Sequence, residues 1–210
     1  DWSRHSATLD AFGTYRTSLR GTGFREFLGG VDAAARFDLG KDYELKTALG
    51  YHRRPEEATS PVGLPATASR PLRQTMTGEV GLEKAIGPVR IRATGAVARN
   101  TYGSADLVGS GVLSQADRNQ TLYTVKLRGG YEVSPALLPF VELEAGRRNY
   151  DLRVDGNGYA RSANRLGARA GVAFDRGEKL NGEIAAGVIG ENFDDARLGT
   201  LSAFAIDGKA

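Results

Sequence analysis

Apolar and polar residues alternate along most of this chain, most clearly between residues 27 and 39. Even positions there carry Asp32, Arg36 and Asp38. A period of two predicts an extended strand, because successive side chains of a strand point to opposite faces. The odd positions would share the apolar face, and they hold Phe27, Val31, Ala33, Ala35, Phe37 and Leu39.

The same alternation returns about ten times along the 210 residues. These strands are nearly twice the length of about 5–6 residues that is usual in globular proteins, and a strand that crosses a bilayer at a tilt needs about 9–11 residues. We therefore predict an all-β fold, an antiparallel up-and-down transmembrane β-barrel formed by residues 1–210 as one domain, or as a fragment of one. The predicted strands cover approximately residues 4–18, 27–39, 43–51, 74–84, 89–102, 120–133, 140–150, 163–174, 180–193 and 198–207.

The predicted connections fall into two classes. Short turns near residues 40, 86, 136 and 176 alternate with longer loops near 62, 110 and 156. In an up-and-down meander the two classes lie at opposite ends, as do the short periplasmic turns and long extracellular loops of outer-membrane barrels. We expect the proline-rich loop 53–73 and the loop 103–118 to gate or constrict the mouth.

Aromatic residues gather at the ends of the predicted strands, whereas the strand middles carry Ala, Val, Leu, Ile and Gly. A soluble sandwich would place bulky rings centrally, but a membrane barrel places them in two interfacial girdles. The pattern favours a membrane barrel over a soluble all-β domain, which stays open as an alternative. The predicted girdle comprises Tyr15, Phe27, Phe37, Tyr43, Tyr51, Tyr102, Tyr123, Tyr131, Phe140, Tyr150, Phe174 and Phe193.

Composition adds constraints on the compartment and on the class of protein. The mean hydropathy is −0.34, and the chain has no apolar run long enough for a membrane-spanning helix; a barrel whose strands alternate would escape that test. The absence of cysteine excludes disulfides and thiolate metal sites. No signal peptide is visible, and both ends resemble interrupted strands, so we expect a segment of a longer secreted precursor.

The polar face of the predicted strands is rich in charge, and acidic strands largely alternate with basic ones. Two interpretations stay open together: structural ladders of opposite charges across strands, and a positive stripe of Arg90, Arg92, Lys126 and Arg128 that selects anionic solutes. The residues predicted to line the lumen are Glu79, Glu83, Arg90, Arg92, Lys126, Arg128, Glu142, Glu144, Arg165, Arg169 and Glu183.

The sequence gives little support for catalysis, for metal or cofactor binding, or for nucleic-acid binding. Neither His5 nor His52 has a nearby Ser/Asp arrangement, so we predict no enzyme. The carboxylates of residues 151–157 and 194–195 lack EF-hand spacing, so we predict no metal and no cofactor. The arginines are interleaved with acids and lack stacking aromatics, so we predict no nucleic-acid partner.

The last third of the chain resembles the outer-membrane beta-barrel porin family of proteobacteria. The residues that carry the resemblance are Phe140-Val141-Glu142, Asn149-Tyr150-Asp151, Gly158-Tyr159-Ala160-Arg161-Ser162, Leu180-Asn181-Gly182-Glu183 and Asn192-Phe193-Asp194-Asp195. The resemblance implies a location in the bacterial outer membrane, beside lipid and lipopolysaccharide, and a polysaccharide conduit related to exopolysaccharide export.

Together these observations predict a channel or export conduit for small solutes or polysaccharide, with an anionic solute or a polysaccharide as its cargo. The alternative is a non-conducting structural or surface barrel that presents loops to a partner. Because ten strands enclose only a narrow interior, we also expect that a protein partner or further strands complete a conducting barrel.

Overall fold

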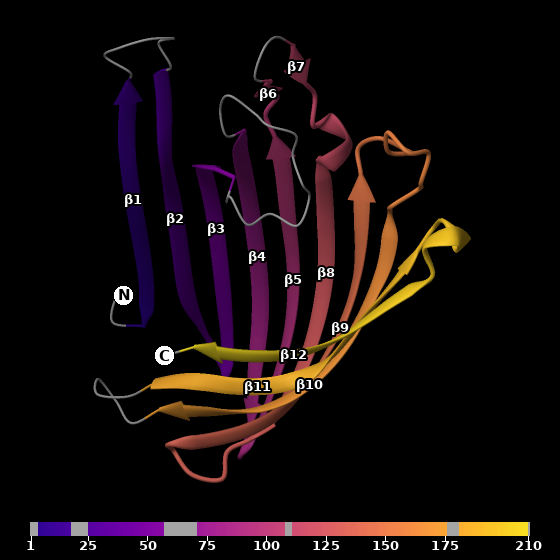
Figure 1. The fold of residues 1–210 in the computed structure, drawn as a ribbon. Coiled ribbons are helices and arrows are strands. Elements are labelled where there is room, and N and C mark those ends of the chain that lie inside the picture. The colour runs from indigo at the N-terminus through magenta and orange to yellow at the C-terminus, as the bar shows by residue number, and fades with distance from the viewer. Residues whose placement is uncertain (1–3, 18–24, 57–70, 108–110, 176–180, 210) are drawn as a thin grey trace.

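The computed structural model describes residues 4–17, 25–56, 71–107, 111–175 and 181–209 (Figure 1). Ten long strands form one antiparallel sheet in which each strand pairs with its neighbours in chain order. This arrangement confirms the predicted all-β, up-and-down fold. The strands are β1 (His5–Thr17), β2 (Arg25–Gly40), β3 (Tyr43–Pro55), β4 (Leu72–Ile86), β5 (Val89–Tyr102), β8 (Gln120–Tyr131), β9 (Leu137–Tyr150), β10 (Ala163–Asp175), β11 (Asn181–Phe193) and β12 (Thr200–Lys209).

One face of the sheet is apolar and exposed. The register brings Leu45, Leu82, Ala93, Leu127 and Leu143 side by side across β3, β4, β5, β8 and β9. The exposed fraction is 53% for Leu127 and 57% for Leu143. Large apolar side chains of the described strands therefore face outward instead of forming the dry core that a soluble sandwich requires.

The sheet curls toward its other, charged face. Arg128 on β8 donates to Glu183 on β11 at 2.5 Å, although β9 and β10 lie between these strands. On a flat sheet three strand spacings of about 4.8 Å would separate the two backbones. Figure 1 shows the curl, with β10, β11 and β12 passing in front of β3, β4 and β5. We call the charged face the concave face and the apolar face the convex face.

The curled sheet does not close in the described residues. β1 pairs only with β2 and β12 only with β11 within this sheet, so both are edge strands. Nearly every residue of β1 is exposed, which fits a strand covered by neither a second edge nor a packed layer. The structure is thus an open or partial barrel. No described helix has the length and apolar character needed to cross a membrane.

Two connections differ from the prediction. The region 103–118, predicted as a long loop, contains a small hairpin of β6 (Ala105–Asp106) and β7 (Val112–Leu113), followed by the 3-10 helix η1 (Ala116–Arg118). The predicted strand 140–150 begins earlier, because β9 starts at Leu137 and includes Pro139, which pairs with Val172. The ladder between β8 and β9 reaches only as far as Phe140, so the missing N–H of Pro139 costs no hydrogen bond with β8. Most of the predicted loop 53–73 lies outside the described residues.

Glycines on the strands make room for aromatic rings from neighbouring strands. A Cβ atom added to Gly171 on β10 would lie 2.7 Å from the Phe140 ring and 2.4 Å from the carbonyl oxygen of Ile184. The ring of Phe140 therefore covers a position that has no room for a side chain. In contrast, a Cβ atom at Gly129 on β8 would meet nothing within 4 Å.

We expect Gly171→Ala to lower the free energy of unfolding by about 1–3 kcal/mol, because the new methyl group forces the ring and backbone apart. Gly129→Ala is the matched control, and it should be neutral or raise stability by up to about 1 kcal/mol, because a strand glycine is itself unfavourable. Urea titration in detergent micelles, followed by circular dichroism, measures both. Equal stability of the two variants would contradict the packing described here.

Candidate functional site

The concave face carries a ladder of ion pairs, and every residue predicted to line the lumen lies on this face by register. One row runs through Glu83, Arg92, Arg128, Glu142 and Arg169, which are successive cross-strand partners from β4 to β10. Most of the remaining predicted residues lie an even number of positions from this row on the same strands. Glu183 lies on β11, four positions from Gly187, which is the cross-strand partner of Arg169. Whether the face lines a lumen stays a prediction.

Glu142 is the centre of the ladder. Its side chain is only 5% exposed and accepts a hydrogen bond from Arg128 Nε at 2.7 Å and one from Arg169 Nε at 2.9 Å. Arg128 also contacts Glu183, as described above, and its guanidinium carbon lies 3.9 Å from the centre of the Phe140 ring. A carboxylate between two guanidiniums can be buried because each of its oxygens has a charged donor.

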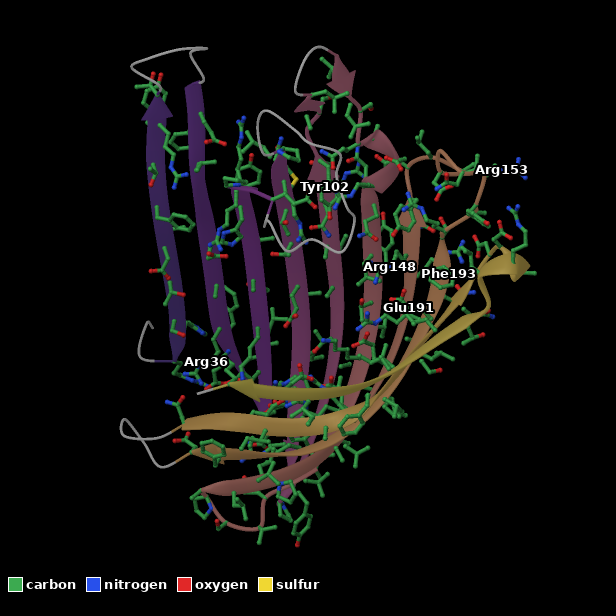
Figure 2. The ribbon with its side chains drawn as sticks, in the orientation of Figure 1. Arg36, Tyr102, Arg148, Arg153, Glu191 and Phe193 are labelled. Carbon is green, nitrogen blue, oxygen red and sulfur yellow. The ribbon has the colours of Figure 1, made fainter. Side chains whose placement is uncertain are left out.

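A second part of the ladder lies nearer the long loops. Arg165 Nε donates to Glu144 at 2.6 Å and Arg148 Nη2 donates to Glu191 at 2.6 Å. Figure 2 shows Arg148 and Glu191 pointing toward each other across the concave face. Lys126 Nζ lies 3.8 Å from Glu144. Acids and bases of different strands therefore pair with each other through space.

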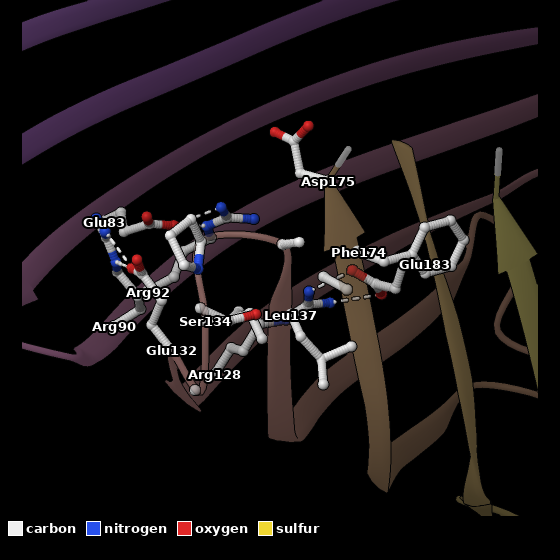
Figure 3. Close-up of a pocket in the computed structure, with 15 residues that line it drawn as sticks. Glu83, Arg90, Arg92, Arg128, Glu132, Ser134, Leu137, Phe174, Asp175 and Glu183 are labelled. Atoms are coloured by element: carbon white, nitrogen blue, oxygen red, sulfur yellow. Dashed lines mark hydrogen bonds and ion pairs between the residues drawn. The ribbon is translucent and has the colours of Figure 1, made fainter. Parts of the chain in front are cut away.

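A cavity of about 350 Å³ lies on the concave face near the short turns (Figure 3). Arg90 Nη2 donates to Glu132 at 2.6 Å, and Arg92 Nε donates to Glu83 at 2.7 Å. The lining also includes the apolar residues Pro135 and Leu138 and the acidic residues Asp175 and Glu183. The cavity thus combines paired charges with apolar side chains.

In the structure, carboxylates neutralise the positive charges of the predicted stripe. Each of its cations has a carboxylate within 4 Å: Glu132 for Arg90, Glu83 for Arg92, Glu144 for Lys126, and both Glu142 and Glu183 for Arg128. Arg92 and Arg128 are direct cross-strand partners, a like-charge arrangement that is destabilising without such carboxylates. This geometry favours the structural ladder over the anion-selective stripe.

The predicted aromatic girdle divides between the two faces. By register Tyr102, Phe140, Tyr150 and Phe193 share the concave face with the ion pairs, and Phe140 is only 4% exposed. Assigning these rings to an outward girdle was wrong, because the prediction used their height along the strand and ignored whether their positions were odd or even. The rings that lie on the convex face by register are Tyr15, Phe27, Phe37, Tyr43, Tyr51, Tyr123, Tyr131 and Phe174.

Two equivalent arginine–aspartate clips lie on the convex face at the long-loop end. Arg99 on β5 donates to both oxygens of Asp151, which follows β9, at 2.9 and 2.6 Å. Arg147 on β9 donates in the same way to Asp194, which follows β11, at 2.7 and 2.5 Å. In both clips the hydrogen bonds from arginine lower the pKa of the aspartate. The prediction missed these clips, although the repeated Asn-aromatic-Asp sequence at 149–151 and 192–194 marks them.

The loop carboxylates that were considered for metal binding have other partners. Asp155 accepts from the backbone N–H of Asn157 and Tyr159, at 2.9 and 3.0 Å. Asp195 accepts from the N–H of Ala160 at 3.1 Å and from Nε of Arg197 at 2.8 Å. Within the described part of the chain, no group of three or more potential ligands could hold a metal ion.

These contacts change the titration of both loop aspartates. Hydrogen bonds from the backbone, led by Tyr159, lower the pKa of Asp155, and hydrogen bonds led by the Arg197 side chain lower the pKa of Asp195 strongly. The ionised form of each aspartate is therefore the form that holds the loop.

Of the two histidines, His52 lies 2.9 Å from Asp32 and the His5 ring lies beside Phe37.

Comparison with known proteins gives one family. A family model described as "Putative beta-barrel porin 2" matches residues 1–210, the whole chain. No curated protein matches the chain.

We expect Glu142→Gln to lower the free energy of unfolding by about 2 kcal/mol, because Arg128 and Arg169 both lose a charged acceptor in a buried position. Glu79→Gln makes the same chemical change on the same face and should have an effect below about 0.5 kcal/mol, because the Glu79 side chain is exposed. Urea titration in micelles again gives both values. A Glu142→Gln variant as stable as Glu79→Gln would show that the ladder adds nothing to stability.

The loop held by Asp155 and Asp195 should loosen only in strong acid. A carboxyl group whose pKa is lowered on folding stabilises the folded loop above the ordinary aspartate pKa of about 3.9, and this stabilisation is lost as the pH falls through the lower folded value. Amide hydrogen exchange at Ala160 and Arg197 should therefore show full protection at pH 5 and at pH 7. Asp195→Asn should reduce protection at both pH values, and loss of protection between pH 7 and 5 in the unsubstituted chain would contradict the assignment.

Proposed function

Since this chain belongs to the beta-barrel porin family that it matches from residue 1 to residue 210, we propose that it acts as a passive channel of the bacterial outer membrane. The observation that carries the proposal is the two-faced sheet. Its convex face exposes apolar side chains, and its concave face buries paired charges. A sheet with one apolar and one charged face suits an environment that has lipid on one side and a water-filled space on the other.

The convex face supports contact with acyl chains and lipopolysaccharide. Ile91, Val125 and Ile184 lie on the convex face by register and are 42%, 65% and 61% exposed. Exposed apolar area on this scale is unfavourable in water and marks a membrane or protein contact. Strands of 13 to 16 residues, such as β3 and β2, are long enough to cross the hydrocarbon region at a tilt.

The concave face supports a conduit for small polar solutes or a polysaccharide chain more than a filter for anions. Compensated Arg/Glu pairs offer both hydrogen-bond donors and acceptors, but leave little net field to select one sign of charge.

A second candidate function, a non-conducting structural barrel, is favoured by a different observation. The ion pairs of β8, β9, β10 and β11 reach across the concave face and occupy space there. A ten-strand barrel has an interior that side chains can fill. In that case the loops would contact a partner, and no solute would pass.

Recording from planar bilayers that contain the purified full chain tests the proposal. We expect stepwise openings and, in a tenfold KCl gradient, a reversal potential close to zero, far from the value of about 59 mV that ideal selectivity for one ion sign would give. Glu142→Gln together with Glu144→Gln should shift the reversal potential toward anion selectivity, because positive charge on the wall is then uncompensated.

Heat-unfolded protein serves as the control for leakage. If the folded chain gives no openings in repeated preparations, the channel proposal fails and the structural barrel is supported.

A further inference from the structure

A charged contact crosses the concave side of the sheet at its long-loop end. Arg118, the last residue of η1, donates from Nη1 to Glu56 at 2.8 Å and also contacts the second carboxylate oxygen through Nη2. Glu56 directly follows β3, and Arg118 lies two residues before β8. Both side chains are largely buried, with exposed fractions of 13% for Arg118 and 7% for Glu56.

The contact spans several strands. The sheet order is β3, β4, β5, β8, so three strand spacings of about 4.8 Å separate the strands that carry the two residues. Between them, the Arg118 guanidinium lies 4.1 Å from the centre of the Tyr102 ring at the end of β5. Tyr102 lies on the concave face, as shown above and labelled in Figure 2, so the contact passes over the inner side of the mouth.

The segment that carries Arg118 is held from both sides. Gln115 is only 2% exposed, and its Nε2 donates to the carbonyl oxygen of Gly103 at 3.0 Å. Asn119 accepts a hydrogen bond from the backbone N–H of Tyr102 at 2.8 Å. Arg161, from the loop between β9 and β10, donates to the carbonyl oxygen of Asp117. We call residues 115–119 together with Glu56 the mouth strap.

We infer that the mouth strap sets the upper size limit of the solutes that pass this end of the channel. The inference rests on the proposed function. A buried, doubly hydrogen-bonded ion pair is costly to break by removing one partner, so the strap stays in place while small solutes pass beside it. Glu56 and Arg118 thus determine which solutes pass, because the strap that they hold in place limits the width of the mouth.

Swelling of proteoliposomes in neutral oligosaccharides of graded length tests the inference. We expect Glu56→Gln and Arg118→Gln each to raise the swelling rate for the largest probes by about threefold or more, since the strap loses its charged anchor. The exchanged double variant, Glu56→Arg with Arg118→Glu, should restore the limit. The control is Arg147→Gln, which removes an ion pair at the same end of the sheet but on the convex face, and it should leave the size limit unchanged.

Cross-linking gives a second measurement that uses one folded sample. Because the chain has no cysteine, the double variant Glu56→Cys/Arg118→Cys can be joined by a reducible bis-thiosulfonate reagent. The joined form should exclude large probes, and reduction should admit them. An unchanged limit in the reduced, joined and single-variant forms overturns the mouth strap while the channel stands. If the unsubstituted chain passes no probe at all, the proposed function fails and the strap fails with it.

Discussion

The rest of this structure depends on ion pairs between strands that are not neighbours in the sheet. Arg128 reaches Glu183 from β8 to β11, Arg148 reaches Glu191 from β9 to β11, and Arg169 lies 3.2 Å from Asp207, from β10 to β12. The Arg128–Glu183 pair spans three strand spacings, so it needs the inner side of a curled sheet. The desolvation of these charges is tolerable only because each charge has a partner. The curl and the pairing therefore require each other. An apolar convex face then follows, because the charged positions of the alternating strands are already committed to the inside.

Much of the fold could be predicted from the sequence, because a period of two is a local signal that repeats on every strand. The predicted strand at 89–102 has the same bounds as β5, and the predicted charged face is the concave face. The aromatic residues show where such reasoning fails. Phe140 lies near the end of its strand, where an interfacial ring is expected. Its ring nevertheless covers Gly171 and contacts the Arg128 guanidinium. These contacts are known only once the register of the strands is known.

The mouth strap shows a second limit of sequence reasoning. Glu56 and Arg118 are separated by 62 positions, and both lie in connections, where no periodicity indicates direction. The sequence identified both connections only as long loops. Nothing in their composition reveals that η1 places an arginine over Tyr102. The arginine–aspartate clips are an intermediate case, since their repeated Asn-aromatic-Asp sequence was visible but the distant arginine partners were not.

The two clips also suggest how the sheet is built along the chain. In each clip an arginine three residues before a strand-end aromatic, Tyr102 or Tyr150, pairs with the aspartate that follows the strand two places further in the sheet. The register places Arg99 beside Thr121 and Asn149, and Arg147 beside Asn164 and Asn192, so the geometry is the same both times. Each added hairpin is thus tied at its rim to the strand before it, on the convex face. The concave face is then left to the ladder and the strap, so the contacts that hold neighbouring hairpins together are separate from those that shape the interior.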